Sequence, residues 1–438
     1  MSVRIGGGQG FYGDGHAPLA DLLDSSLDYL VCEALAELTL AILQKDRQRD
    51  ESLGYTRDLP RYVGTALPYL LDGRTRMITN AGGINPIAAG RAVVDSLHTY
   101  GVTGLRIATI VGDDIRPHAA ELSLPADTLF ANAYIGAAPI VEALASGAQL
   151  VIAGRVADAS LFLAPLIHEY GWAADDWDRL AAGVTVGHLL ECSGQVTGGN
   201  YSGDWWNNDD PLRVGFPIGE VESDGTFVMT KPTGTGGRVT FDTVREQLLY
   251  EVHDPSAYLN PDVTADFSTV RLEDLGSDRV RVTHCSGSAR PTLLKGLVCT
   301  PAGWAGEARF AYGWPDAEAK ARAAVAFVRG RAEQNGVEVD DWHEEYFGLN
   351  AFGGPTLGDD IDHDPPEVMG RLAWRSPSAE EAGRVALDGG LLGLSGPPMI
   401  AAADRARGGR PTQLLQLTPI GVGRDLVASQ MRVEITDI

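Results

Sequence analysis

The feature that most constrains the fold is a repeated succession of a short apolar segment, a polar turn and an amphipathic segment in the N-terminal half. It occurs in "LDYLVCEALAELTLAIL" (27–43), "RMITNAGGINPIAAGRAVVDSLHTYG" (76–101) and "QLVIAGRVADASLFLAPLIHEYGW" (149–172), and "GLRIATIVGDDI" (104–115) adds one more apolar segment. Short apolar segments are typical of buried strands, and the spacing that follows them is helical. Strands that alternate with helices predict a mostly parallel sheet covered on both faces. We therefore expect a doubly wound, Rossmann-like α/β domain over residues 1–202.

Beyond residue 202 the composition changes. Residues 203–235 contain short β-like pieces separated by Pro, Gly, Asn and Asp, which indicates a β-rich connector. Residues 236–438 mix helical and hairpin patterns, including a helix predicted over 316–336. A chain of 438 residues exceeds what one small core needs. We expect residues 236–438 to form a second, α+β lobe packed on the first.

The charge of the chain limits its partners. Its 59 acidic and 35 basic residues give a formal net charge of −24, which repels nucleic acid and anionic lipid. The N-terminus lacks a secretory signal, no apolar segment is long enough to cross a membrane, and the four cysteines are scattered. We expect a cytoplasmic protein with reduced thiols that self-associates and binds a small molecule. A polyanionic ligand such as coenzyme A would need a local basic patch, either Arg74 with Arg76 or Arg405 with Arg407 and Arg410.

Polar residues follow the predicted strands at the edge where α/β sheets bind ligands. They are the candidate catalytic residues Glu33, Asn80, Asp113, Arg155 and Asp158, together with Asp114. Arg155 could clamp a substrate carboxylate, or form a local ion pair with Asp158, which would then cap the next helix. Asp113 and Asp114 point to opposite sides of extended backbone, so one could contact a ligand or metal while the other caps the following segment.

The stretch "GHLLECSGQVTGGNYSG" (187–203) adds a carboxylate and an anion-binding turn. Glu191 ends an apolar helix, where burial would raise its pKa and suit it to acid–base chemistry, whereas Cys192 fits inert packing. His188 precedes Glu191 by three positions and could share its helix face. Two turns, "TGGN" and "NAGGINP", could bind an anion or enolate or be purely structural, and the substrate-binding candidates in them are Thr197, Gly198, Gly199, Asn200, Gly82, Gly83 and Asn85.

Cofactor motifs are incomplete. "GGGQGFYGDG" (6–15) is either a phosphate-binding loop, with Gly8, Gly10 and Asp14 as cofactor contacts, or a structural turn, and it lacks the P-loop lysine. There is no H-E-x-x-H pair and no G-x-S-x-G elbow. A divalent metal held by oxygen ligands from separate turns stays open, with no ligand assigned.

Several segments, in order, resemble one known family. They are "GGGQGFYGDGHAPLADLLDSSLDYLVCEALAE", "ITNAGGINP", "YIGAAPIVEALASGAQLVIAGRVADASLFLAPLIHEYGW", "GHLLECSGQVTGGN" and "TGTGGRVTFDTVREQLLYEVHDPSAYLNPDVTADFS". Together they resemble the acyclic terpene utilisation (AtuA) family. The resemblance implies the catabolism of branched isoprenoid acids as coenzyme A thioesters, through hydration, carboxylation and carbon–carbon cleavage. Many members have an additional small C-terminal α+β domain, and we expect this chain to be the core region without it.

These observations favour an enzyme of small-carboxylate or acyl-thioester metabolism. Our hypothesis is a lyase, either a hydratase/dehydratase or a retro-aldol carbon–carbon lyase, which needs a base, donors for an enolate and a cation for a distal carboxylate. Glu191 would be the base or acid, Asn80 and the glycine turns the enolate site, and Arg155 the clamp. A metal-dependent hydrolase of an ester, lactone or thioester, and a non-catalytic subunit of a larger complex, are the competing hypotheses.

Overall fold

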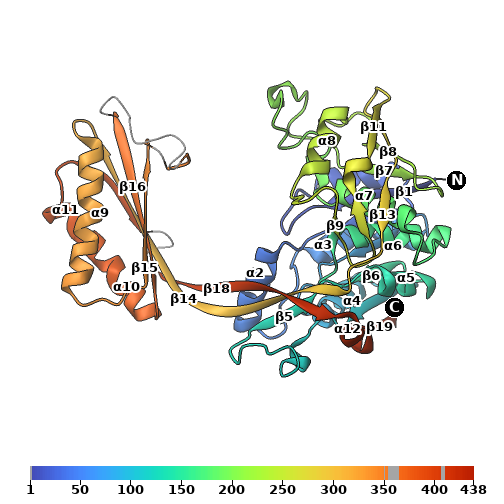
Figure 1. Ribbon diagram of the computed structural model, residues 1–438, viewed down its shortest axis with the longest axis horizontal. Helices are drawn as coiled ribbons and strands as arrows, with labels where there is room; N and C mark the ends of the chain where they lie inside the picture. The colour runs from blue at the N-terminus through green and yellow to red at the C-terminus, as the bar shows by residue number, and fades with distance from the viewer. Residues whose placement is uncertain (1, 350, 354–364, 406–409) are drawn as a thin grey trace. The chain divides into compact units, whose positions relative to one another are not determined.

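The computed structural model describes residues 2–349, 351–353, 365–405 and 410–438, and its chain forms two compact units (Figure 1). The first unit is Met1–Cys299 with Leu417–Ile438, and the second is Thr300–Gln416. The domain boundaries expected from the sequence, near 203 and 236, both lie inside the first unit.

The first unit is built on a ten-stranded mixed sheet. Its parallel part has the order β1 (Val3–Gln9), β2 (Tyr29–Cys32), β3 (Arg76–Thr79), β6 (Leu150–Ile152) and β4 (Arg106–Val111). Antiparallel strands extend both edges: β7 (Ile218–Val221), β8 (Phe227–Thr230), β12 (Val280–Thr283) and β11 (Arg271–Asp274) beyond β1, and β19 (Arg432–Asp437) beyond β4. The strands predicted after residues 27, 76, 104 and 149 are therefore confirmed, within a larger mixed sheet.

Helices pack on both faces of the parallel strands because successive strand residues face opposite cores. Val31 and Ile78 join the core that contains residues of α5 (Ala138–Ala145), α6 (Asp158–Tyr170) and α7 (Trp177–Leu190). Leu30 and Met77 join the other core, with α1 (Pro18–Leu23), α3 (Leu59–Leu71) and α4 (Pro86–Thr99). A further helix, α2 (Glu37–Arg49), follows β2.

Three glycines expected in a loop are in a strand instead. Gly6, Gly7 and Gly8 belong to β1 and are buried. A methyl group on Gly6 would lie 2.6 Å from Leu27 Cδ1, and one on Gly7 would collide with the carbonyl of Leu190. The glycines therefore let this strand and its neighbours approach closely, which is a packing reason for a pattern that resembles a phosphate loop.

The remainder of the first unit extends the sheet or flanks it. Thr240 caps α8 (Phe241–Leu249), because its side chain accepts from the Thr243 N–H. The strands β9 (Tyr258–Leu259), β10 (Thr264–Asp266) and β13 (Ser286–Ser288) form a small sheet. Strand β5 (Phe130–Ala133) pairs with the start of β14 (Leu293–Gly313), and α12 (Arg424–Gln430) precedes β19.

The second unit has its own antiparallel sheet and core. It contains the later part of β14 with β15 (Asp341–Phe347), β16 (Glu367–Ser376) and β17 (Ile400–Arg405), while β18 (Thr412–Gly423) pairs with β14. Its helices are α9 (Ala317–Gln334), α10 (Ala379–Asp388) and α11 (Leu392–Ser395). Phe310 and Leu372 of the sheet share a buried cluster with Val325 of α9. Within the described residues, no helix is both long and apolar enough to cross a membrane.

Candidate acid–base site

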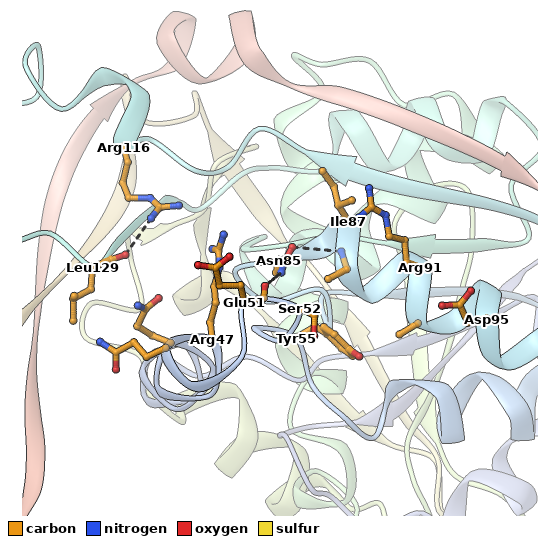
Figure 2. A pocket seen from close by; sticks show the side chains of 14 residues that line it. Arg47, Glu51, Ser52, Tyr55, Asn85, Ile87, Arg91, Asp95, Arg116 and Leu129 are labelled. Atoms are coloured by element: carbon orange, nitrogen blue, oxygen red, sulfur yellow. Dashed lines mark hydrogen bonds between the residues drawn. The ribbon is translucent and has the colours of Figure 1, made fainter.

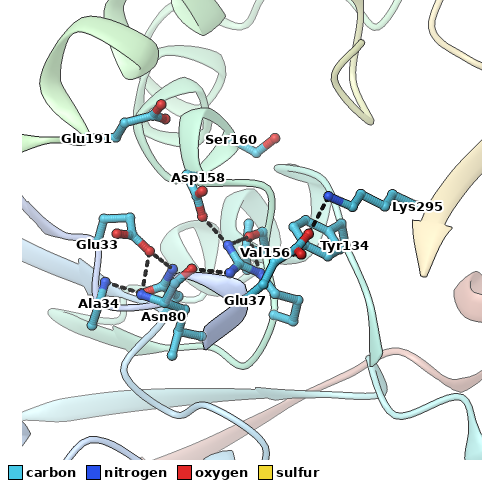
Figure 3. Close-up of polar contacts among 12 residues, drawn as sticks. Glu33, Ala34, Glu37, Asn80, Tyr134, Val156, Asp158, Ser160, Glu191 and Lys295 are labelled. Atoms are coloured by element: carbon cyan, nitrogen blue, oxygen red, sulfur yellow. Dashed lines mark hydrogen bonds and ion pairs between the residues drawn. The ribbon is translucent and has the colours of Figure 1, made fainter. Parts of the chain in front are cut away.

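Glu33 and Asn80 meet where β2 and β3 end. The Asn80 amide donates to Glu33 Oε1 at 2.9 Å, and its Oδ1 accepts from the Ala34 N–H at 2.8 Å (Figure 3). Glu33 Oε1 also accepts from the Leu35 N–H. Both side chains are buried, so Asn80 fixes the orientation of the Glu33 carboxyl group.

Arg155 connects the end of β6 to the end of β2. Its guanidinium donates to the carbonyls of Leu35 and Val156 and to the Asp158 carboxylate. The Arg155 side chain is only 1% exposed, whereas that of Asp158 is 35% exposed. The local ion pair, one of the two roles expected for Arg155, is therefore present. Asp158 is the first residue of α6, and its side chain does not cap that helix.

Beside Arg155 lies a group of side chains in mutual contact, formed by Tyr134, Lys295 and Glu37. Arg155 Cζ lies 4.5 Å from the Tyr134 ring centroid, and Lys295 Nζ lies 4.8 Å from the same centroid. Glu37 Oε1 accepts from Lys295 Nζ at 2.6 Å and from the Tyr134 hydroxyl at 3.2 Å. Tyr134, Lys295 and Ala157 line a pocket of about 450 Å³ whose walls also include leucines and prolines. This pocket therefore reaches Ala157, the residue before Asp158, and has one half-exposed ammonium group, that of Lys295.

Burial makes two of the carboxyl groups weak acids. Asp158 has a pKa raised to about 6, chiefly by burial, with Arg155 opposing the rise and Glu191 adding to it. Burial also raises the pKa of Glu33 well above its usual value, and Asp158 adds to the effect. A carboxyl group with a pKa near neutrality can exchange a proton with a substrate at physiological pH.

Asp113 holds the turn after β6. Its Oδ2 accepts from the Arg155 N–H and from Asn132 Nδ2, both at 2.8 Å. Burial raises its pKa to about 6. A methyl group on Gly154 would lie 2.6 Å from Asp113 Oδ2, which explains the glycine there. Asp114 points elsewhere and binds Arg116, so the two neighbours have separate partners.

Glu191 approaches the same region from the end of α7. Its Oε1 lies 3.0 Å from His188 Nδ1, one helical turn earlier, as their spacing suggested. The His188 ring is buried against Phe267 and Tyr258. Glu191 Oε2 and His188 Nε2 are buried and have no hydrogen-bond partner among the described residues. Buried polar atoms of this kind normally have a partner, so these two atoms keep hydrogen-bonding capacity that the described residues do not use.

The comparison with known proteins agrees with the resemblance seen in the sequence. Residues 3–433 match the family described as acyclic terpene utilisation family protein AtuA. The chain belongs to the AtuA family. No curated protein and no solved structure matches it. The match includes both compact units of this AtuA-family chain.

The glycine turns expected to bind an anion use their N–H groups internally. The Gly82 N–H donates to the Ala153 carbonyl at 3.0 Å, and the Gly83 N–H donates to the Asn80 carbonyl at 3.1 Å. The N–H groups of Gly198 and Gly199 likewise donate to Gln195 and Gly194. Thr197 Oγ1 donates to the Gly215 carbonyl at 2.6 Å, and Asn200 is exposed with a φ of 58°. In this AtuA-family chain, the N–H groups of both glycine turns therefore stabilise the local backbone conformation.

The candidate cofactor residues of the AtuA-family chain also contact protein. Gly8 lies within β1, and a methyl group on it would come within 2.5 Å of Leu30 Cδ1. Asp14 accepts from the Gly10 N–H at 2.9 Å and from Ser193 Oγ at 2.8 Å. This loop therefore packs against the segment that follows Glu191. Cys192 nearby has a pKa raised by burial, which fits the packing role expected for it.

Sequence reasoning missed several residues of the site. Tyr134 follows β5, so the strand-end rule applied to that segment would have found it, but Lys295 and Glu37 had no such signal. No group of three His, Cys, Asp or Glu side chains in the described part of the chain could hold a metal. Of the basic patches proposed for coenzyme A, Arg74 pairs with Asp72 and Arg76 contacts the Leu144 carbonyl. Arg407 lies outside the described residues, as does the side chain of Arg405, and Arg410 lies at the start of the described segment that ends the chain.

Proposed function

We propose that this chain is an enzyme that moves a proton on a small carboxylate or acyl thioester, as a lyase of the hydratase/dehydratase or retro-aldol type. The observation that carries the proposal is the partly exposed Asp158 carboxyl group, which has a pKa near 6 raised in part by Glu191 and directly follows Ala157 of the pocket wall. The order of the parallel strands and the helices on both faces support a doubly wound interpretation, in which ligands bind beyond the carboxyl ends.

Asp158 and Glu191 are the proposed acid–base pair. Asp158 is partly exposed, so it can reach a substrate, and its raised pKa lets it act as acid or base near neutral pH. Glu191 has a carboxylate oxygen without a partner among the described residues. Arg155 is a positioning residue here, because its three guanidinium nitrogens already donate to protein oxygens.

Lys295 replaces Arg155 as the proposed contact for a substrate carboxylate. Its side chain is 49% exposed at the pocket, and within the described part of the chain its ion-pair partner is Glu37. The apolar walls of the pocket would receive the acyl part of the substrate. Glu33 and Asn80 would supply a second buried carboxyl group and hold its orientation.

Neither a metal-dependent hydrolase nor a non-catalytic subunit gains specific support. The hydrolase would need a set of metal ligands that the described residues do not provide.

The excess of acidic residues supports small-molecule binding over nucleic acid, and the four free cysteines support a reducing, cytoplasmic location. Self-association remains part of the proposal.

Proton exchange tests the function without knowledge of the full reaction. The protein is incubated in D2O with short acyl thioesters of coenzyme A and with free dicarboxylates, and loss of the α-proton signal is followed by NMR. The native chain should exchange the α-proton of at least one acyl group. Asp158→Asn and Glu191→Gln should each slow exchange by about 100-fold or more, the lower range for lost general acid–base catalysis.

Asp175→Asn is the matched control, because Asp175 is exposed and has no hydrogen bond or ion pair with any described residue. It should exchange at the native rate. Failure of the native chain to exchange any of these protons would contradict the proposal and favour a non-catalytic subunit. Native-like exchange by the Asp158 and Glu191 variants would remove both residues from the mechanism.

A further inference from the structure

A second pocket, of about 810 Å³, lies in the first unit and shares no lining residue with the pocket that Lys295 lines. It is bounded by α2, by the start of α4 and by the segment after β4, and Figure 2 shows its labelled side chains. Three guanidinium groups line it: Arg47, Arg91 and Arg116. On a chain with a net charge of −24, such a concentration of arginines is a local exception.

Two of these guanidinium groups have no carboxylate partner among the described residues. Arg47 Nη1 donates only to the Ile84 carbonyl, at 3.2 Å. Arg91 makes no hydrogen bond or ion pair to any described residue. Arg116, by contrast, pairs with Asp114, and its Nη2 donates to Asp114 Oδ2 at 2.6 Å. The carboxylate of Asp114 therefore offsets the charge of Arg116. Arg47 and Arg91 are therefore the groups available to an anion.

Gln44 adds a neutral amide to the same pocket. The residue is only 7% exposed, and its side chain makes no hydrogen bond to any described residue. Its amide is therefore available to donate to a ligand in the pocket. The same wall contains the N-terminus of the 14-residue helix α4, whose cap is Asn85, and helix N-termini favour negative charge.

The remaining wall suits the organic part of a ligand. Tyr55 offers a ring, and Glu51 and Asp95 offer acceptors for hydroxyl groups. The cavity volume is within the range of about 300–1,000 Å³ typical of small-molecule sites. Guanidinium groups bind phosphate through paired, charge-assisted hydrogen bonds.

We propose that this pocket binds a phosphate group, with Arg47 and Arg91 as its principal ligands and Gln44 as a neutral donor. The site is distinct from the proposed acid–base residues, and the proposal does not depend on any turnover by the chain. The phosphate could be free or part of a small organic phosphate that uses Tyr55 and the acidic side chains.

Calorimetric titration of the full chain with inorganic phosphate, and separately with adenosine monophosphate, tests the site. We expect saturable binding of at least one probe. Arg47→Gln and Arg91→Gln should each weaken it by about tenfold, the effect of one charge-assisted contact of about 1.4 kcal/mol. Arg49→Gln is the matched control, because Arg49 lies on the same helix, is 78% exposed and does not line the pocket. It should bind like the native chain.

Removing a negative charge from the pocket should have the opposite effect on phosphate affinity. Glu51→Gln should tighten phosphate binding several-fold, because it removes a like charge from the pocket. Tighter binding of adenosine monophosphate than of phosphate would identify an organic phosphate as the ligand class, and equal affinity would identify free phosphate. Absence of saturable binding of both probes up to about 10 mM, an affinity of about −3 kcal/mol, would overturn the proposal. Unchanged affinity in the Arg47 and Arg91 variants would do the same.

Discussion

Arg155 has almost no solvent exposure, and it holds together backbone and carboxyl groups from different strand ends. Its charge is balanced mainly by Asp158, with Glu33 also close enough to affect it. Removing one member of a buried ion pair leaves the other charge uncompensated, which is far more costly than losing a surface pair.

Arg155→Met should therefore lower the free energy of unfolding by about 3–5 kcal/mol in urea denaturation. Arg281→Met serves as the control, because Arg281 is half-exposed and pairs with Glu273 at the surface. It should cost no more than about 1 kcal/mol. An Arg155 variant as stable as the control would show that the guanidinium does not hold the site together.

The raised pKa of Asp113 predicts that the stability of the chain depends on pH. Its pKa in the folded chain is raised to about 6 by burial, whereas an unfolded aspartate has a pKa of about 3.9. The folded state therefore binds the proton more tightly, and this contribution to stability, full below about pH 4, is lost as the pH rises through about 6. Glu33 and Asp158 act in the same direction.

In Asp113→Asn the free energy of unfolding should fall less between pH 4 and pH 6.5 than in the native chain. The difference between the two proteins should be about 2 kcal/mol over this range, because most but not all of a shift of about two pKa units, at about 1.4 kcal/mol each, is expressed there. Asparagine keeps an oxygen that can accept from Arg155 and Asn132, so the fold should persist. Urea titrations of both proteins across this range provide the measurement, and parallel curves would contradict the raised pKa.

Helices α6 and α7 place Asp158 and Glu191, and a glycine sets their separation. A methyl group on Gly187 of α7 would lie 2.6 Å from the Ala159 Cα, which directly follows Asp158. Gly187→Ala should therefore push the helices apart and cost about 1–3 kcal/mol of stability, as overpacking does. We also expect slower α-proton exchange, because the two carboxyl groups would move apart.

Gly64→Ala is the control for this change. Gly64 lies inside α3, and a methyl group on it meets nothing within 4 Å. Because alanine favours helices, this variant should be more stable than the native chain by about 0.5–1 kcal/mol. Thermal unfolding distinguishes the two substitutions, and equal effects would show that Gly187 is not needed for close helix packing.

The elements that sequence predicted well are those whose signal is local. The strands before Glu33, Asn80 and Asp113 carry their own apolar pattern, and the polar residue after each strand follows from the topology of parallel sheets. The glycines of β1 gave the opposite outcome. Their need for close packing against Leu27 and Leu190 depends on tertiary contacts, which no local pattern records.

At the scale of the whole molecule, the sequence could not show where the first unit ends. Strands β7, β8, β11 and β12 add to the same sheet in antiparallel fashion, and β19 returns from the C-terminus to pair with β4. Such pairings join segments that are distant in sequence, so a local pattern does not reveal them. Near residue 203 the composition changes where the chain passes from the parallel strands to antiparallel strands of the same sheet, within one unit. The contact of Arg155 with the Leu35 carbonyl was hidden for the same reason, since Leu35 lies 120 residues away, whereas its local partner Asp158 could be predicted.

The proposed chemistry depends on an Asp158 carboxyl group whose pKa the assembled first unit raises to about 6. A titration by NMR of the chain labelled with ¹³C at the aspartate carboxyl carbons measures this directly. We predict a resonance that titrates near pH 6 and is missing from Asp158→Asn, separate from the Asp113 resonance that Asp113→Asn removes. If the resonance assigned to Asp158 titrated near 4, as in an exposed aspartate, the proposed acid–base site would be contradicted.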